Sequence, residues 1–385
     1  MNNVNLLVLA DPSIPGFFAA QWSVLRRDPT ITGNIDGGGE MRAIVTRSAG
    51  SMELTDVPEP RELASGEVLV RPEAVGVCGS DYHFLTGELV TPEAFGPQYP
   101  RIQGHEVAGT IEALGPDCPA GLDVGVRVAV WPLSSCGTCY ACRIGRRNAC
   151  PNFRLVGVHV DGALQERFPV PASQVFPVGD LEPQVAAFCE PTSIAVQAAD
   201  RGRIAAGEPV AVLGAGPIGQ AVALVAGERG AKVLMTDLVA GRLALGRAAG
   251  AETLDLSEHE DVVPLVREWA GGEGPPVVID CTGEPAAIRS AVEMISPAGR
   301  VVVVGISHKE LSLNVSWFTE KEPDILGSTV CGAAQFAEAV RVVQRKQAVV
   351  RRLLTHERPL EQAPDAIAHA MSHPAEVMKL IIRTG

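Results

Sequence analysis

The fold is decided by residues 209–219, which read Pro209-Val210-Ala211-Val212-Leu213-Gly214-Ala215-Gly216-Pro217-Ile218-Gly219. The apolar run predicts a buried strand, and the Gly-x-Gly-x-x-Gly pattern after it predicts a tight turn into a helix. Such a turn lets the backbone approach a pyrophosphate at the helix N-terminus, and its last glycine allows close packing of helix and strand. We therefore expect a dinucleotide to be held by Gly214, Gly216, Pro217, Ile218 and Gly219.

The residues around this turn alternate between strands and helices. Strands are expected at 209–213, 232–236, 277–280, 300–304 and 325–330, and helices between them, as at 217–229 and 240–249. This alternation predicts an α/β fold with a doubly wound parallel sheet over residues 191–331.

Asp237 ends the second of these strands, about 20 residues after the glycines, where a carboxylate accepts hydrogen bonds from the adenosine ribose. The same charge repels a 2′-phosphate, so we expect NAD and not NADP. Arg242 lies five residues further on. It either flanks the ribose or is a solvated helix residue.

The chain before the parallel sheet has a different sequence pattern. Residues 41–190 are interrupted by Gly and Pro and hold short β-rich runs at 67–71, 106–113 and 127–130, which predicts a small β-barrel-like domain. Residues 1–40 carry turn and linker signals, and we expect an extension that is disordered or not native. Gly38-Gly39-Glu40 before Met41 is the peptide that a purine-rich ribosome-binding site would encode if it were translated, so Met41 is expected to be the functional start. The alternative is that residues 1–40 form a genuine mobile extension or cap.

Composition excludes several classes of function. The 385 residues are 46% hydrophobic and 20% charged, which is a globular composition. The net charge of −13 disfavours nucleic acid and anionic membrane surfaces. No apolar run approaches the roughly 20 residues that span a bilayer. An odd count of nine cysteines is no disulfide framework, and the N-terminus lacks secretory features, so we expect a cytoplasmic protein.

Four cysteines form one cluster in the sequence, Cys136, Cys139, Cys142 and Cys150. Four thiolates at this spacing can enclose a tetrahedral ion with no open position, as structural zinc sites do. The surrounding lobe, residues 134–152, is rich in turn formers and would depend on its metal for folding. An iron–sulfur cluster is the alternative, although the spacing fits zinc better.

A second potential set of metal ligands is spread along the chain. Cys78 follows an expected strand, His105 opens another, and Cys189-Glu190 precede the parallel sheet. One thiolate, one imidazole and one carboxylate are three zinc ligands, and they leave a fourth position for substrate. Each residue alone is a weak signal, since a lone Cys or His is usually structural.

The order of these motifs resembles the zinc-dependent medium-chain alcohol and polyol dehydrogenases, in particular the sorbitol dehydrogenase-like branch, from Met41 to Gly385. The resemblance rests on Cys-Gly-Ser-Asp at 78–81, Gly-His-Glu-x-x-Gly at 104–109, the four-cysteine lobe, Glu190-Pro191, the glycine fingerprint, Gly327-Ser328 and Leu354-Thr355-His356. It implies a GroES-like catalytic domain at 41–190, a Rossmann domain at 191–331, and a return of 332–385 to the catalytic domain. It also implies a homodimer or homotetramer with one catalytic and one structural zinc per chain.

The resemblance also implies the catalytic ligands. Cys78 and His105 match the first two zinc ligands, and Glu106 matches a neighbouring carboxylate that can exchange at the metal. Glu190 stands where ethanol-type members have a second Cys. Cys189 is the competing candidate, and we expect it to point away because adjacent residues of an extended segment face opposite sides.

The implied reaction is hydride transfer from an alcohol to NAD. Ser80 matches the hydroxyl that contacts the substrate oxygen, and His83 matches the histidine that hands the proton to solvent. The expected substrate is a small hydroxylated molecule, a polyol, sugar acid or cyclitol, whose pocket Tyr82, Phe84 and residues 86–100 would shape. Alternatives are an amino-alcohol such as threonine, a zinc-free quinone or enoyl reductase, and a non-catalytic NAD- or zinc-binding protein. His159, His308 and His356 are expected to be structural or on the surface.

Overall fold

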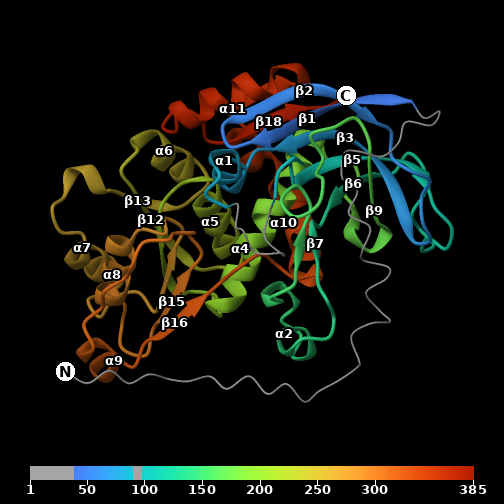
Figure 1. Cartoon of the computed structure of the whole chain (residues 1–385). Helices are drawn as coiled ribbons and strands as arrows, with labels where there is room; N and C mark the ends of the chain where they lie inside the picture. The colour runs from blue at the N-terminus through green and yellow to red at the C-terminus, as the bar shows by residue number, and fades with distance from the viewer. Residues whose placement is uncertain (1–38, 90–97) are drawn as a thin grey trace, which may run out of the picture.

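The computed structural model describes residues 39–89 and 98–385 (Figure 1). Most of the expected extension 1–40 and part of the expected pocket loop 86–100 therefore lie outside the described residues. The first strand, β1, begins at Glu40, and the carbonyl of Gly39 accepts the Glu59 amide at 3.0 Å. No helix in the described part of the chain is long and apolar enough to cross a membrane.

A six-stranded, all-parallel sheet carries the glycine turn. Its strand order is β13-β12-β11-β14-β15-β16. The strands are β11 (Pro209–Leu213), β12 (Lys232–Asp237), β13 (Glu252–Asp255), β14 (Val277–Asp280), β15 (Arg300–Val303) and β16 (Asp324–Gly327). The chain starts in the middle of this sheet and winds outward in both directions, which is the doubly wound topology that the alternation predicts.

Both faces of this sheet are covered. Val210 and Val212 of β11 join a core shared with helix α5 (Pro217–Glu228), whereas Ala211 and Leu213 join a second core with α7 (Val263–Trp269) and α8 (Pro285–Met294). Successive residues of a strand point to opposite faces, so an uninterrupted apolar run suits a sheet buried on both sides.

A second, mainly antiparallel sheet has the order β10-β6-β5-β3-β18-β17, with β9 also paired to β3. Its strands are β3 (Glu67–Gly76), β5 (Glu106–Leu114), β6 (Arg127–Val130), β9 (Phe168–Pro171), β10 (Val175–Pro177), β17 (His356–Pro359) and β18 (Leu380–Arg383). β18 pairs with β3, so the end of the chain lies beside its beginning. The smaller sheets contain β1 (Glu40–Ser48), β2 (Ser51–Pro58) and β4 (Arg101–Ile102), and β7 (Leu133–Ser134) with β8 (Arg154–Leu155).

Helices connect the two large sheets. α4 (Cys189–Arg201) and α10 (Ala333–Leu353, with a non-helical Lys346) lie between them (Figure 1). One apolar core runs from Ala74 and Ala108 of the antiparallel sheet through Val196 of α4 to β11. The other helices are α1 (Gly79–Thr86), α2 (Tyr140–Arg143), α3 (Pro183–Ala187), α6 (Ala240–Ala248), α9 (Ser316–Lys321) and α11 (Ala363–Ser372).

The expected fold class is confirmed, with three local differences. Strand β13 was not expected, because three of the four residues in its sequence Glu-Thr-Leu-Asp are polar; it lies at the sheet edge. The expected strand 325–330 stops at Gly327, and Val330 has a positive φ of 44°. The segment Cys189-Glu190 is wrongly expected to be extended, since it forms the first turn of α4.

Candidate active site and metal centres

Cys78 lies where β3 passes into α1. It is the N-cap of that helix, and its backbone N–H donates to Asp81 Oδ2 at 2.9 Å. Its thiol, a nitrogen of His105 and a carboxylate oxygen of Glu106 all lie within 4.8 Å of one another. Glu106 is the first residue of β5 and His105 directly precedes it, so the two central strands of the antiparallel sheet bring this group together.

His105 is prepared for a metal or another electrophile. It is buried, and its Nδ1 has no hydrogen-bond partner in the described structure. Burial lowers the pKa of His105, but the negative charge of Asp81, Cys78 and Glu190 outweighs burial and holds this pKa well above its usual value. A buried imidazole amid carboxylates and a thiol, with its Nδ1 3.8 Å from Asp81 Oδ1 and not hydrogen-bonded, fits a cation between these groups.

Glu106 has a partner that sequence reasoning missed. The ammonium of Lys379 donates to both Glu106 carboxylate oxygens, at 2.6 and 2.7 Å, and to the carbonyl of Val77 at 3.0 Å. Both side chains are almost fully buried, at 2% and 1% exposure. The available signal was a lone cation in the apolar run Met378-Lys379-Leu380-Ile381-Ile382, because a buried Lys requires a counter-charge.

Glu190 and Cys189 differ in their surroundings. Cys189 is fully buried in the apolar core, which raises the pKa of its thiol. Burial raises the pKa of Glu190 to about 7, while His105 lowers it and Glu106 raises it, so these three groups interact. The ligand atoms of Cys78, His105 and Glu106 lie within 4.8 Å of one another. Glu190 is adjacent to this group but is not one of its members.

Ser80 and His83 lie on α1 but are not joined to each other by a hydrogen bond in the described structure. Ser80 Oγ faces His105 Nε2 at 3.5 Å, beside the potential metal ligands. The ring of His83 is 46% exposed, and its Nδ1 lies 2.5 Å from Glu88 Oε2. Glu88 was missed although Gly87 is a signal for a helix end: α1 ends at Gly87 with φ 89°, and the chain folds the Glu88 carboxylate back to His83.

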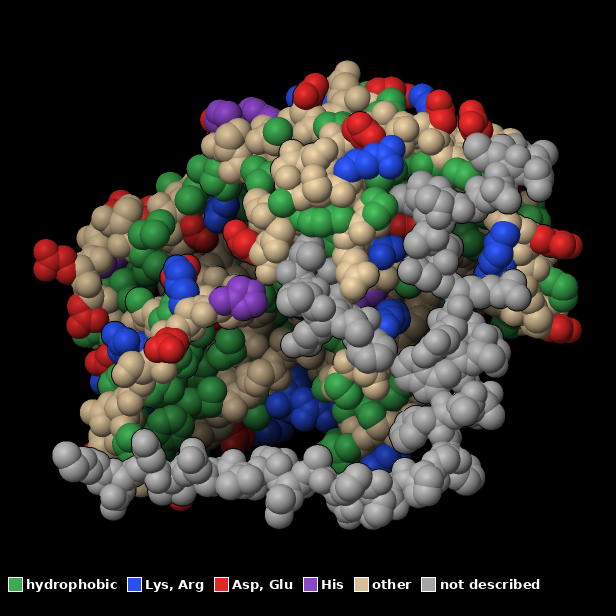
Figure 2. Space-filling model, in the orientation of Figure 1, with side chains coloured by type: hydrophobic (Ala, Val, Ile, Leu, Met, Phe, Trp, Pro, Cys, Tyr) green, Lys and Arg blue, Asp and Glu red, His purple; other side chains and the backbone are tan. Residues whose placement is uncertain are grey.

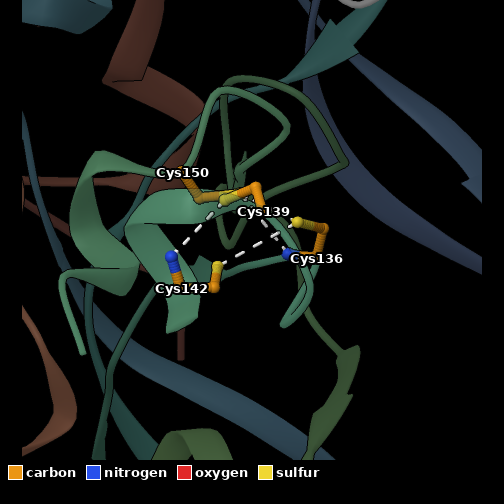
Figure 3. Close-up of side chains that lie close together, drawn as sticks. All are labelled: Cys136, Cys139, Cys142 and Cys150. Carbon is orange, nitrogen blue, oxygen red and sulfur yellow. Dashed lines mark hydrogen bonds between the residues drawn. The ribbon is translucent and has the colours of Figure 1, made fainter. Parts of the chain in front are cut away.

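The four-cysteine lobe brings its thiols to one point (Figure 3). Cys136 Sγ lies 3.4 Å from Cys150 Sγ and 4.0 Å from Cys142 Sγ. Four thiolates bound to zinc at about 2.3 Å in a tetrahedron are about 3.8 Å apart, so this arrangement fits the ion. All nine cysteines, every one of them within the described residues, are free.

Backbone amides support the lobe. The N–H groups of Thr138 and Cys139 lower the pKa of Cys136 to about 6, which favours the thiolate that a metal needs. Asn148 Nδ2 donates to the carbonyl of Thr329 at 2.9 Å, so the lobe is tied to the end of the parallel sheet.

The glycine turn has the shape required for a pyrophosphate. Gly214 has a φ of 92°, and a Cβ on Gly219 would lie 1.8 Å from the carbonyl oxygen of Gly214. A Cβ on Gly216, the N-cap of α5, would meet no atom within 4 Å. The space in front of that helix N-terminus is therefore open to an anion. Pro217 and Ile218 form the first residues of α5.

Asp237 ends β12 beside this turn. Its Oδ2 accepts the Ala215 amide at 2.7 Å and its Oδ1 accepts the Val239 amide at 2.8 Å. The carboxylate is thereby held in place at the edge of the turn. Arg242 Nη1 lies 3.9 Å from Asp237 Oδ2, and Nη2 donates to the carbonyl of Pro374 at 2.5 Å. Arg242 is therefore a partner of Asp237 and of the C-terminal segment.

His159 has a structural environment. Its Nδ1 accepts the Leu155 amide at 3.2 Å, and its ring packs edge-on against Phe153 at 5.1 Å. Burial lowers its pKa to about 4, helped by Arg154 and Arg101. His308 is exposed, and His356 lies on β17.

Comparison with known proteins agrees with this geometry. Residues 64–180 match the family model for the alcohol dehydrogenase GroES-like domain, and residues 217–345 match that for zinc-binding dehydrogenases. L-galactonate-5-dehydrogenase of Escherichia coli (strain K12) is 34% identical over 331 residues, covering 85% of this chain and 94% of the relative. Sorbitol dehydrogenase of Bacillus subtilis (strain 168) is 31% identical over 350 residues, covering 89% and 97%.

Solved structures give the same result. An enzyme of E. coli CFT073, described as a short chain alcohol dehydrogenase complexed with NADH, superposes with a TM-score of 0.80 at 30% identity, covering 90% of this chain and all of the other. A putative zinc-binding dehydrogenase of Sinorhizobium meliloti 1021 bound to NADP has a TM-score of 0.81 at 29% identity, with the same coverage. The chain therefore belongs to the zinc-dependent medium-chain alcohol and polyol dehydrogenases.

Proposed function

We propose that this enzyme oxidises a secondary hydroxyl of a polyol, sugar acid or cyclitol and transfers the hydride to NAD. The observation that carries the proposal is the group of a half-buried Cys78 with the buried His105 and Glu106, and with Glu190 beside it. Two carboxylates make this site polar, and a site built to bind several hydroxyls would leave its polar groups unpaired with ethanol. The named sugar-acid and polyol dehydrogenases among the relatives support the same substrate class.

Cys78, His105 and Glu190 would hold a catalytic zinc, with Glu106 as a neighbouring carboxylate that can exchange at the metal, and the four-cysteine lobe would hold a structural zinc. When bound, a catalytic zinc acts as a Lewis acid that lowers the pKa of a substrate hydroxyl. Ser80 Oγ, next to His105, is placed to accept the hydroxyl proton. His83, paired with Glu88, would receive that proton from Ser80 through a bridging hydrogen-bonding group. It would then release the proton to solvent. Lys379 holds the carboxylate of Glu106 in position.

We propose NAD as the preferred acceptor because of Asp237. Its carboxylate stands at the ribose end of the turn and would repel a 2′-phosphate. Arg242 opposes this preference in part, but its guanidinium is already bonded to the Pro374 carbonyl and lies near Asp237.

The enzyme would act as a cytoplasmic homodimer or homotetramer. The free cysteines support the cytoplasmic location. The assembly is supported by β16, which is an edge strand of the parallel sheet, and by the exposed apolar side chains of Ile306, Val315 and Phe318, which precede β16 in the sequence. Sedimentation velocity of the full chain would show a single species of monomer mass if the assembly is absent.

The test is an NADH absorbance assay on zinc-loaded protein with sorbitol, L-arabinitol, L-galactonate, a cyclitol, threonine and ethanol. One of the polyhydroxylated compounds should give by far the highest kcat/KM. Cys78→Ser should retain one zinc per chain and lose activity by more than about 100-fold, since even outer partners of a metal are worth 10–100-fold. Cys118→Ser, at a cysteine outside both clusters, is the matched control. Preference for ethanol or threonine would contradict the substrate proposal, and an active Cys78→Ser would contradict the metal site.

A further inference from the structure

A chain of three buried polar side chains leads from the first strand to the group of potential zinc ligands. Thr46 lies on β1, and Gln103 directly follows β4, which pairs with β1 at this point. Asp81 lies on α1. Many charged side chains lie on the surface (Figure 2), whereas Asp81 is only 3% exposed and Thr46 and Gln103 are fully buried. Polar groups are costly to bury unless they are hydrogen-bonded, so the partners of these three side chains matter.

The contacts of Gln103 fix the direction of the hydrogen bonds in this chain. Its amide nitrogen Nε2 lies 2.9 Å from the backbone carbonyl oxygen of Asp81 and 3.2 Å from Asp81 Oδ1. A carbonyl and a carboxylate oxygen accept hydrogen bonds, so the NH₂ group of Gln103 faces Asp81 and its amide oxygen faces away. Thr46 Oγ1 lies 2.6 Å from that amide oxygen and therefore donates to it. One arrangement of donors and acceptors is consistent with all three contacts.

The two carboxylate oxygens of Asp81 have different surroundings. Oδ2 accepts the backbone N–H of Cys78 at 2.9 Å, which caps the first turn of α1. Oδ1 accepts from Gln103 and faces His105 Nδ1 at 3.8 Å. Capping of the helix needs only Oδ2, so the bond from Gln103 acts on the oxygen that faces the imidazole. Asp81 thus lies between two of the proposed zinc ligands, and Gln103 fixes the direction of its carboxylate.

The direction of this carboxylate matters to a metal site. Metal-binding histidines almost always donate their other ring N–H to a carboxylate, a carbonyl or water, and this bond fixes the orientation of the ring. A carboxylate oxygen accepts two hydrogen bonds, so Oδ1 of Asp81 can accept from His105 as well as from Gln103. His105 Nδ1 has no partner in the described structure, and an approach of about 1 Å makes this bond. If the carboxylate of Asp81 were free to rotate, this alignment would be lost.

We propose that Gln103 is a positioning residue for the catalytic metal and acts through Asp81. Thr46 in turn holds the amide of Gln103 in the required orientation. The inference rests on the zinc site of the proposed function. An apolar side chain would fill the same buried volume without needing hydrogen bonds, so packing alone does not account for an amide at this place. A buried polar network whose members are paired makes its surroundings rigid, which is what a preformed metal site requires.

The test measures zinc affinity in place of turnover. Competition with a chromophoric chelator gives the Kd of each zinc ion in the full-length protein, and Cys78→Ser identifies the curve that belongs to the four-cysteine lobe. Gln103→Leu should weaken binding of the catalytic zinc by about tenfold or more, the scale at which outer partners of the ligands affect metal affinity, and should leave the lobe zinc unchanged. Thr46→Val should weaken the same zinc, and Thr46→Ser should restore its affinity because serine keeps the hydroxyl.

The matched control is Gln165→Leu, which changes a second buried glutamine, one whose Nε2 donates to the carbonyl of Gly162 at 2.6 Å. This variant should lose stability in urea and bind both zinc ions as the parent does. The proposal is overturned if Gln103→Leu binds the catalytic zinc as tightly as the parent, or if Gln165→Leu weakens that zinc equally.

The pair of Thr46 variants keeps the test decisive if Gln103→Leu does not fold. Equal zinc affinity in Thr46→Val and Thr46→Ser would then overturn the proposal. A parent that binds only one zinc would refute the catalytic zinc site and this inference with it. A parent with two zinc ions and unaltered variants would refute the role of Gln103 alone.

Discussion

Replacing Lys379 with methionine removes the ammonium group that faces the Glu106 carboxylate. Methionine is similar in length to the lysine stem and keeps most of its apolar packing, so the change isolates the charge. The lost contacts are those at 2.6 and 2.7 Å to Glu106 and at 3.0 Å to the Val77 carbonyl. The carboxylate has no room to turn aside, since a Cβ added to Gly76 would lie 2.1 Å from Glu106 Oε2.

The expected cost follows from burial. Removing one partner of a buried ion pair leaves an uncompensated charge and costs about 3–5 kcal/mol of unfolding free energy. An exposed pair of similar geometry is worth at most about 1 kcal/mol. The chain contains such a pair, because Lys309 bonds the two oxygens of Glu284 at 2.7 and 2.8 Å with both side chains more than half exposed.

Urea unfolding of the zinc-loaded parent, Lys379→Met and Lys309→Met measures both costs side by side. The double variant Lys379→Met/Glu106→Gln should recover part of the loss, because it removes the stranded charge. Lys379→Met should also lower kcat, since Glu106 is no longer held beside His105. Equal stability losses in Lys379→Met and Lys309→Met would refute the reasoning from burial.

Three further outcomes are expected. Asp237→Ala should reduce kcat/KM for NAD by about tenfold or more, the worth of a charge-assisted hydrogen bond, and raise the relative efficiency with NADP; a parent that prefers NADP would contradict this. Cys139→Ser should lose the lobe zinc and unfold at a lower temperature, as elemental analysis and a thermal melt would show, because structural zinc contributes folding free energy directly. The folded-state pKa of His159, about 4, lies below its unfolded value of about 6.5, so the unfolded state binds the proton first and stability falls as the pH drops through this window. His159→Phe should remove about 1–3 kcal/mol of this pH-dependent loss of unfolding free energy, a figure reduced to allow for the partial exposure of the ring. Urea unfolding at both ends of the pH window measures the effect. An unchanged pH dependence in the variant would show that His159 is not its source.

Features that depend on short spacing could be predicted from the residues alone. The glycine turn, the apolar runs of the parallel sheet and the four cysteines each lie within a few consecutive residues, and their backbone geometry follows from local chemistry. The same logic failed at Cys189-Glu190, where local reasoning expected an extended segment and the chain forms a helix. Helix formation there depends on packing of α4 between the two sheets, which no short window contains.

Contacts between distant groups could not be predicted and became visible in the folded chain. Lys379 is 273 positions from Glu106, and the two form a buried ion pair because β18 returns to β3. The rings of His356 and His369 likewise lie 6.1 Å apart because β17 and α11 are side by side. Charge pairs and imidazole clusters of this kind carry no periodic signal in the sequence, since their energy comes from desolvation and direct contact, which arise only when the chain is folded.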